Sequence, residues 1–286
     1  MNTVTLNNGE QIPQLGIGVY LVKSADCGPA LARAFQVGYR LVDTANSYLN
    51  ERAVGAAIRD SGVPREDIFL TSKLWPPNYR YDKAVPAIES TLKRLGTDYL
   101  DLLLLHQQYG DYNGAWKAME EAVAAGKVRT IGVSNFDQRR FTDLAGNARI
   151  MPAVSQVECH PYYQQRDLKE FLAPFGTALE AWYPLGHANK GLLAEPLFAQ
   201  LAQKHGKSPV QVILRWHMQE GHIAIPRSTD PAHIASNLEI FDFTLTPDEM
   251  DSIARLDRNK PFFRMPDFVG RIIFPAARIN FDKRQR

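Results

Sequence analysis

The run YLDLLLLH, residues 99–106, is the clearest indication of the fold, because its four consecutive leucines, Leu102–Leu105, leave no polar position on either face. A short, wholly apolar run of this kind is typical of a parallel strand that is buried on both sides. Similar short runs recur along the whole chain. The strands predicted in this way are Leu15–Val19, Tyr39–Asp43, Ile68–Lys73, Tyr99–His106, Arg129–Ser134, Ala153–Val157, Thr177–Trp182 and Ile223–Ile225.

Helical segments separate these strands. The clearest amphipathic ones are Ala25–Val37, Glu51–Asp60, Asp82–Leu95 and Tyr112–Ala125. Repeated strand–helix units require right-handed parallel crossovers, which build either an open doubly wound sheet or a closed barrel. Eight strands in 286 residues match the barrel. The GxGxxG motif of dinucleotide-binding open sheets is incomplete, because Gly16-Ile17-Gly18 has no third glycine. We therefore predict the α/β class and a (β/α)8 TIM barrel.

The two ends of the chain add smaller elements to this barrel. A β-hairpin is predicted from Val4–Leu6 and Gln11–Ile12, with its turn at Asn8-Gly9. Since no linker of biased composition divides the chain, we predict one domain over residues 1–286. The tail, residues 257–286, contains an aromatic, proline-broken loop at 261–268. We expect this tail near the active-site face, with a strap that seals the barrel bottom as the alternative. Its basic end, Lys283–Arg286, is interpreted as solvated.

The composition excludes several classes of protein. Hydrophobic residues make up 45% and charged residues 22% of the chain, which is ordinary for a globular protein. A net charge of +2 gives no overall field for nucleic acid or an anionic membrane. The chain has no signal-peptide pattern and no run long enough to span a bilayer. We expect a cytoplasmic monomer in which Cys27 and Cys159 are free thiols. No metal site is expected, because Cys159-His160 has no further partners at ligand spacing.

Polar residues close the predicted strands at their carboxyl ends, where (β/α)8 barrels hold reactive groups. Asp43 ends the second strand, Lys73 ends the third, and Tyr48 lies in the loop after Asp43. The later strands end at or near His106, Ser134-Asn135, Gln156 and Trp182. Each of these residues also has an ordinary interpretation as a cap, a solvated side chain or a core residue. Their arrival at one rim nevertheless indicates an active site.

The residue types suit hydride transfer to a carbonyl, because the alkoxide-like oxygen that forms needs a proton in the transition state. Tyr48 is the predicted donor of that proton. Since the ordinary tyrosine pKa of about 10 is high for this task, we expect the Lys73 ammonium to lower the pKa of Tyr48. Asp43 would keep Lys73 charged and oriented. Neutral His106 would position and polarise the carbonyl.

Several motifs together resemble the successive signatures of the aldo-keto reductase family. They are Asp43–Tyr48 (DTANSY), Ser72–Trp75 (SKLW), Leu105-His106, Gly132–Phe136 (GVSNF), Gln156–Pro161 (QVECHP) and Ile225–Ser228 (IPRS). The resemblance extends from about Leu15 to Leu256. The motifs are most similar to those of bacterial diketo-gluconate reductase-like and prostaglandin F synthase-like members. It implies an enzyme that reduces carbonyls with NADPH. Its catalytic tetrad falls on Asp43, Tyr48, Lys73 and His106, the four residues that the strand ends already select.

The resemblance also implies how the nicotinamide end of the cofactor is held. Ser134, Asn135 and Gln156 match the residues that hydrogen-bond the carboxamide, and so fix which face of the ring is presented. Trp182 stands where the family stacks an aromatic residue on the ring. Leu185 would approach the pyrophosphate through its backbone.

The adenosine end is less typical. Its predicted contacts are Arg227, Ser228, Thr229, His233 and Asn237. A basic residue and hydroxyls before a helix suit the 2′-phosphate of NADP. The family usually has lysine at the position of Arg227 and arginine at that of His233. Because a histidine is mostly neutral at pH 7, we expect NADPH to be preferred while NADH use is possible.

The substrate pocket is predicted from Tyr20, Trp75, His106 and Gln107. Gln107-Gln108 gives one wall a polar character, which favours small polar aldehydes, dicarbonyls or keto sugars as the small-molecule partner. The alternative from another functional class is a dinucleotide-binding regulatory or sensor protein of the same fold. A barrel isomerase or lyase without nicotinamide leaves the Ser134-Asn135, Gln156 and Arg227-Ser228 positions unexplained.

Overall fold

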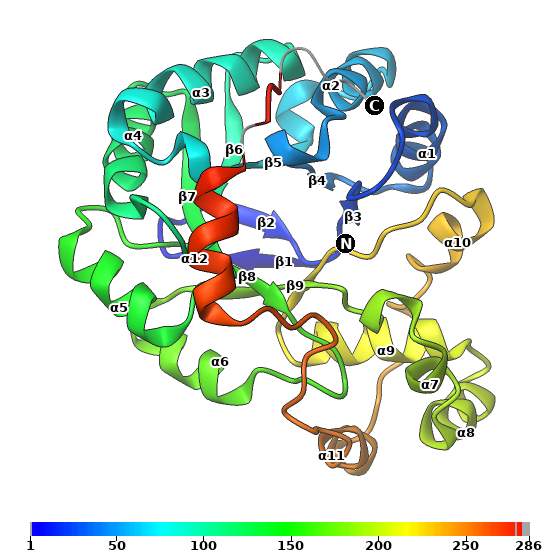
Figure 1. The fold of residues 1–286 in the computed structure, drawn as a ribbon. Coiled ribbons are helices and arrows are strands. Elements are labelled where there is room, and N and C mark those ends of the chain that lie inside the picture. The colour runs from blue at the N-terminus through cyan, green and yellow to red at the C-terminus, as the bar shows by residue number, and fades with distance from the viewer. Residues whose placement is uncertain (1, 278, 282–286) are drawn as a thin grey trace.

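The computed structural model describes residues 2–277 and 279–281, and a barrel of eight parallel strands lies at its centre (Figure 1). The strands are β3 (Ile17–Gly18), β4 (Leu41–Asp43), β5 (Phe69–Leu74), β6 (Leu100–Leu105), β7 (Val128–Ser134), β8 (Val154–Glu158), β9 (Ala178–Trp182) and β10 (Ile223–Ala224). Each strand pairs with the next one in chain order. The predicted TIM barrel is therefore confirmed, and every predicted strand overlaps an observed one.

The barrel closes along a seam between its first and last strands. Leu15 forms a parallel bridge with Ala224, and the Gly16 N–H donates to the Ala224 carbonyl at 2.9 Å. Farther along the seam, the Gly18 N–H donates to the Pro226 carbonyl at 3.0 Å. A Cβ atom on Gly16 would lie 2.5 Å from a side-chain carbon of Leu41, so only glycine fits this close approach.

Helices surround the strands as an outer layer (Figure 1). They are α1 (Ser24–Val37), α2 (Glu51–Asp60), α3 (Tyr81–Leu95), α4 (Tyr112–Ala124), α5 (Gln138–Asn147), α6 (Arg166–Leu172), α7 (Lys190–Leu193), α8 (Pro196–His205), α9 (Pro209–Gln219), α10 (Pro231–Ser236), α11 (Pro247–Ala254) and α12 (Asp267–Ala276). The main apolar core fills the space between this layer and the strands. Over the described ranges, no helix combines the length and apolar character needed to cross a membrane.

The N-terminal hairpin closes one end of the barrel. It consists of β1 (Thr3–Thr5) and β2 (Gln11–Pro13). Leu6 and Ile12 are buried against residues that begin the barrel strands, such as Leu41 and Phe69. The amino-terminal end of the barrel is therefore sealed by the hairpin, and the carboxyl-terminal end is left for a site.

The predicted aromatic loop is present up to Pro266, and the tail then continues as the helix α12, which was not predicted. Gly270 and Phe274, four positions apart, are buried and share one face of this helix. Phe274 packs on Trp75 with ring centroids 5.3 Å apart, and α12 crosses the barrel opening in Figure 1. Glu158, at the end of β8, holds the preceding segment by accepting from the Phe262 N–H at 2.6 Å. The predicted basic end, Lys283–Arg286, lies outside the described residues.

Candidate active site

A buried ion pair lies where β4 and β5 reach the open end of the barrel. Lys73 is fully buried, and its Nζ donates to the two carboxylate oxygens of Asp43 at 2.5 and 2.6 Å. The same Nζ donates to the Thr44 carbonyl at 2.9 Å and to the Tyr48 hydroxyl at 3.3 Å. Burying an ammonium costs several kcal/mol of lost hydration, which these acceptors offset. The structure thus brings together three of the four predicted catalytic residues.

The loop that carries Tyr48 is held in place by a buried asparagine, Asn50. Tyr48 ends a short 3-10 helix, Asn46–Tyr48, directly after β4. Thr44 donates its hydroxyl to Asn50 Oδ1 at 2.9 Å, and Asn50 Nδ2 donates to the Val19 carbonyl at 2.9 Å. Both side chains are completely buried. These bonds fix the loop to β3 and to β4, so the Tyr48 hydroxyl has a defined position relative to Lys73.

The protonation of Tyr48 differs from the sequence-based expectation. Burial raises the pKa of Tyr48 well above its ordinary value, and the nearby Asp43 carboxylate raises it further. The expected lowering by Lys73 is therefore wrong for the protein alone, because Lys73 is already paired with Asp43 at a shorter distance. Tyr48 is a neutral phenol that carries its proton at physiological pH.

His106 forms the opposite wall of this cluster. Its ring packs edge-on against Trp75 at 4.9 Å and against Tyr48 at 5.6 Å between centroids. Its Nδ1 lies 3.3 Å from the Ser47 hydroxyl, a contact that the sequence did not single out. Burial, and then the Lys73 charge, lower the pKa of His106 well below its ordinary value. His106 is therefore neutral, as expected, and has one N–H to donate.

Polar side chains of β7 and β8 form a second group beside the tetrad. Asn135 Nδ2 donates to the His106 carbonyl at 3.0 Å, and Asn135 Oδ1 accepts from Trp182 Nε1 at 2.9 Å. Gln156 Nε2 donates to Asp43 Oδ2 at 2.9 Å. Among the described residues, these bonds leave the Ser134 hydroxyl hydrogen and Gln156 Oε1 without a partner. A carboxamide offers a matching acceptor and donor, so this set fits the nicotinamide group.

Glu180 is a buried member of the site that the sequence analysis missed. It lies opposite Gln156 in the β8–β9 register, and Gln156 Nε2 donates to Glu180 Oε2 at 2.9 Å. Burial, followed by the charge of Asp43, raises the pKa of Glu180 to about 8. The available signal was a carboxyl residue within a largely apolar predicted strand, on the same face as Trp182. This signal could have identified Glu180.

The tetrad opens into a cleft of about 950 Å³. The predicted residues that line it are Tyr20, Asp43, Tyr48, Trp75, His106, Gln107, Ser134, Asn135, Gln156, Trp182, Leu185 and Arg227. The tail, which was expected near the active-site face, adds Phe263, Met265 and Phe274. This volume is at the upper end of the range for ligand clefts, about 300–1,000 Å³. The cleft is therefore large enough for an extended ligand.

The residues predicted at the adenosine end are less enclosed. Arg227 is exposed at the cleft edge, and its Nη1 donates to the Tyr20 carbonyl at 3.3 Å. Thr229 and His233 are exposed, Ser228 is half-buried and Asn237 is buried, and none of these four lines the cleft. Asp230 caps α10 by accepting from the His233 N–H at 3.1 Å. Of this group, the structure places only Arg227 with the cleft.

Comparisons with known proteins agree with this geometry. The sequence model described as the aldo/keto reductase family matches residues 15–258. An aldo-keto reductase of Mycolicibacterium smegmatis is 46% identical over 273 residues, which cover 93% of this chain and 98% of the relative. A glyoxal reductase of Bacillus subtilis is 41% identical over 268 residues, which cover 93% and 96%. The crystal structure of a Bombyx mori aldo-keto reductase in complex with NADP has a TM-score of 0.88 at 34% identity and covers 93% of this chain and 96% of that one.

Proposed function

This chain belongs to the aldo/keto reductase family, and from this premise we propose that it is an NADPH-dependent reductase with Tyr48 as its proton donor. The family relationship makes the protein an oxidoreductase that uses a nicotinamide cofactor and supports carbonyl reduction as its reaction. The preference for NADPH, the role of Tyr48 and the class of substrate are the parts that we propose.

The observation that carries the proposal is the 3.3 Å hydrogen bond from Lys73 Nζ to the Tyr48 hydroxyl at the base of a cleft. Because the pKa of Tyr48 is raised, its oxygen carries the proton until a substrate oxygen accepts it. When that proton passes to the substrate oxygen, the phenolate left on Tyr48 is stabilised by the adjacent ammonium of Lys73. Lys73 therefore acts on the product of the transfer more than on the resting phenol.

The remaining residues orient the reactants. When bound, a reduced nicotinamide supplies the hydride that the carbonyl carbon accepts. Ser134 and Gln156 would hold its carboxamide, and Trp182 would lie against the ring. Neutral His106 would donate its N–H to the carbonyl oxygen, which directs that oxygen towards Tyr48. Asp43 and the apolar walls would keep the ion pair fixed and water excluded.

The substrates that we propose are small polar aldehydes, dicarbonyls and keto sugars. Gln107 and Gln108 add polar side chains to a cleft that the aromatic rings of Tyr20 and Trp75 also line. The similarity to a glyoxal reductase supports small dicarbonyls in particular. At the other end of the cleft, Arg227 favours the 2′-phosphate of NADPH, whereas the exposed histidine at 233 weakens that preference. We further propose that the protein acts as a cytoplasmic monomer.

The replacement Tyr48→Phe tests this function. We expect kcat for NADPH oxidation with glyoxal or methylglyoxal to fall by about 10²–10⁴, because the general acid is lost. The affinity for NADPH, measured by quenching of tryptophan fluorescence, should stay near that of the wild type. Unchanged turnover in the variant would contradict the role of Tyr48. Tight NADPH binding by the wild type without turnover of any carbonyl would favour the sensor alternative.

A further inference from the structure

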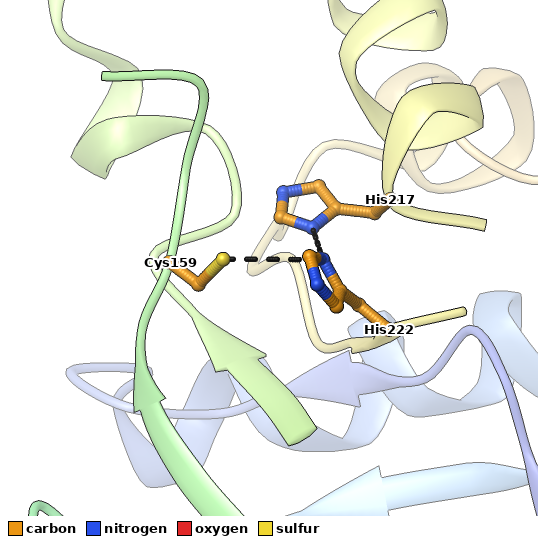
Figure 2. A group of neighbouring side chains, drawn as sticks. All are labelled: Cys159, His217 and His222. Carbon is orange, nitrogen blue, oxygen red and sulfur yellow. Dashed lines mark hydrogen bonds between the residues drawn. The ribbon is translucent and has the colours of Figure 1, made fainter. Parts of the chain in front are cut away.

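Three buried side chains outside the catalytic cluster converge on one point. Cys159 follows β8, His217 lies in the last turn of α9, and His222 precedes β10 (Figure 2). Their exposed fractions are 0%, 0% and 1%. Within the part of the chain that the structure describes, they are the one group of three His, Cys, Asp or Glu residues whose possible metal-ligand atoms all lie within 4.8 Å of one another. In the sequence, His160 directly follows Cys159, whereas the partners His217 and His222 lie far along the chain.

The spacing of the donor atoms is close to that of a metal site. The Cys159 sulfur lies 3.9 Å from His222 Nδ1, and His222 Nδ1 lies 3.2 Å from His217 Nδ1. Sulfur and imidazole ligands at about 2.0–2.3 Å from one ion are themselves about 3.4–3.8 Å apart. Small side-chain movements therefore bring all three atoms to bonding distance from a common centre.

The second nitrogen of His217 is arranged as in known metal sites. Its Nε2 lies 3.1 Å from the Pro184 carbonyl, an acceptor that requires a proton on Nε2. The lone pair of His217 therefore belongs to Nδ1, which faces the other two side chains. A backbone carbonyl that fixes the tautomer in this way is the usual outer partner of a histidine ligand. His222 Nε2 has no hydrogen-bond partner among the described residues, so moving the His222 proton from Nδ1 to Nε2 breaks no bond at that end.

The donor set selects the kind of ion. One thiolate and two neutral imidazoles carry a single negative charge, so a monovalent cation leaves the buried site neutral. A divalent ion would leave a net positive charge in the core, which is costly to bury. Thiolate sulfur and imidazole are the donors that soft cations prefer, and three donors without access to water suit a low coordination number. We propose that Cys159, His217 and His222 bind one Cu(I) ion.

Binding of the Cu(I) ion releases one proton from the protein. The Cu(I) ion forms bonds to the Cys159 sulfur and to Nδ1 of each histidine, and the thiol proton leaves as H⁺. The bound ion would connect the end of β8 to α9 and to the start of β10, next to the Pro184 carbonyl that His217 contacts. Because the ion binds only the folded chain, it should raise the melting temperature.

The test is an anaerobic titration of the metal-free protein with Cu(I) in competition with a chromophoric Cu(I) chelator. We expect one copper per chain in the wild type and loss of that copper in Cys159→Ala and His222→Gln. The matched control is Cys27→Ala, because Cys27 is also a buried free thiol and has no part in the cluster. It should retain one copper. Equal retention in all variants, or equal loss in the two cysteine variants, would overturn the proposal.

A second measurement needs no variant. X-ray absorption of the copper-loaded wild type should show one sulfur and two nitrogen donors, and the melting temperature should rise on loading. A spectrum without sulfur, or no copper retained against the chelator, would mean that the three residues are only a hydrogen-bonded part of the core. Stoichiometric Zn(II) in place of Cu(I) would overturn the charge argument and the proposal with it.

Discussion

Two places on the rim of the barrel, at the carboxyl ends of β4–β5 and of β10, differ in how firmly their side chains are held. At the β4–β5 end, Lys73 is completely buried and joined to Asp43 by bonds of 2.5 and 2.6 Å. At the β10 end, Arg227 is exposed and donates to a carbonyl at 3.3 Å. The first arrangement couples the chemistry to the stability of the barrel. If Arg227 binds the cofactor as we propose, the second allows the choice of cofactor to change without disturbing the fold.

The largest effect should come from the replacement Lys73→Met. Removing the ammonium leaves the Asp43 carboxylate buried without its partner, so the free energy of unfolding should fall by about 3–5 kcal/mol, together with loss of turnover. Urea unfolding measures the stability. The replacement Lys127→Met is the control, because Lys127 also pairs with a carboxylate, that of Glu89, but at the surface. A similar loss in both variants would contradict the contrast between a buried and an exposed ion pair.

A smaller, pH-dependent effect is expected from Glu180→Gln. The pKa of Glu180 is raised to about 8 by burial and by Asp43. Between the ordinary carboxyl pKa and this value, the native protein holds a proton that the unfolded chain releases. Stability therefore falls as pH rises towards about 8, with a slope of up to about 1.4 kcal/mol per pH unit from this group.

Removal of the carboxyl group should flatten that profile. The test is the free energy of unfolding of the wild type and of Glu180→Gln, measured between pH 5 and pH 9 in matched buffers. The control is Asp267→Asn. Hydrogen bonds from Arg271 and Arg140 hold the pKa of Asp267 below its ordinary value. Its replacement should change stability without changing the slope in this range, and parallel profiles for Glu180→Gln would refute the prediction.

The smallest effect on stability, but a clear effect on cofactor choice, is expected from Arg227→Ala. A hydrogen bond to a charged group contributes about 1.5–3 kcal/mol, so KM for NADPH should rise about 10–100-fold while kcat changes little. NADH lacks the 2′-phosphate, so its KM is the internal control and should stay the same. A parallel rise for both cofactors would place Arg227 elsewhere than at the phosphate. The urea midpoint should stay unchanged.

The barrel and the four tetrad residues were predictable from the sequence for the same physical reason. Strands buried on both faces must be apolar, so a polar residue at the end of one stands out. Asp43 and His106 were recognisable in this way, and the structure joins the Asp43 and Lys73 strand ends directly. The start of α2 at Glu51 was also predictable, because the amphipathic period begins there.

Features that depend on three-dimensional neighbours were not predictable. The raised pKa of Tyr48 follows from burial and from the pairing of Lys73 with Asp43, which no local pattern reports. The helix α12 was not recognised because Pro266 directly precedes it and Pro275 lies in its last turn. Cys159 and His222 lie 63 positions apart and meet only because β8 and β10 belong to one barrel.

The seam between β3 and β10 has a consequence for how the protein is made. Leu15 leaves the ribosome well before its partner Ala224, which lies 209 positions later in the sequence. Such distant pairings form slowly, because a long loop must close first. Until Ala224 emerges, the first barrel strand has an unpaired edge and the cleft lacks Arg227. A nascent chain that ends before this point cannot assemble the enzyme, and its open edge is a surface that chaperones must protect.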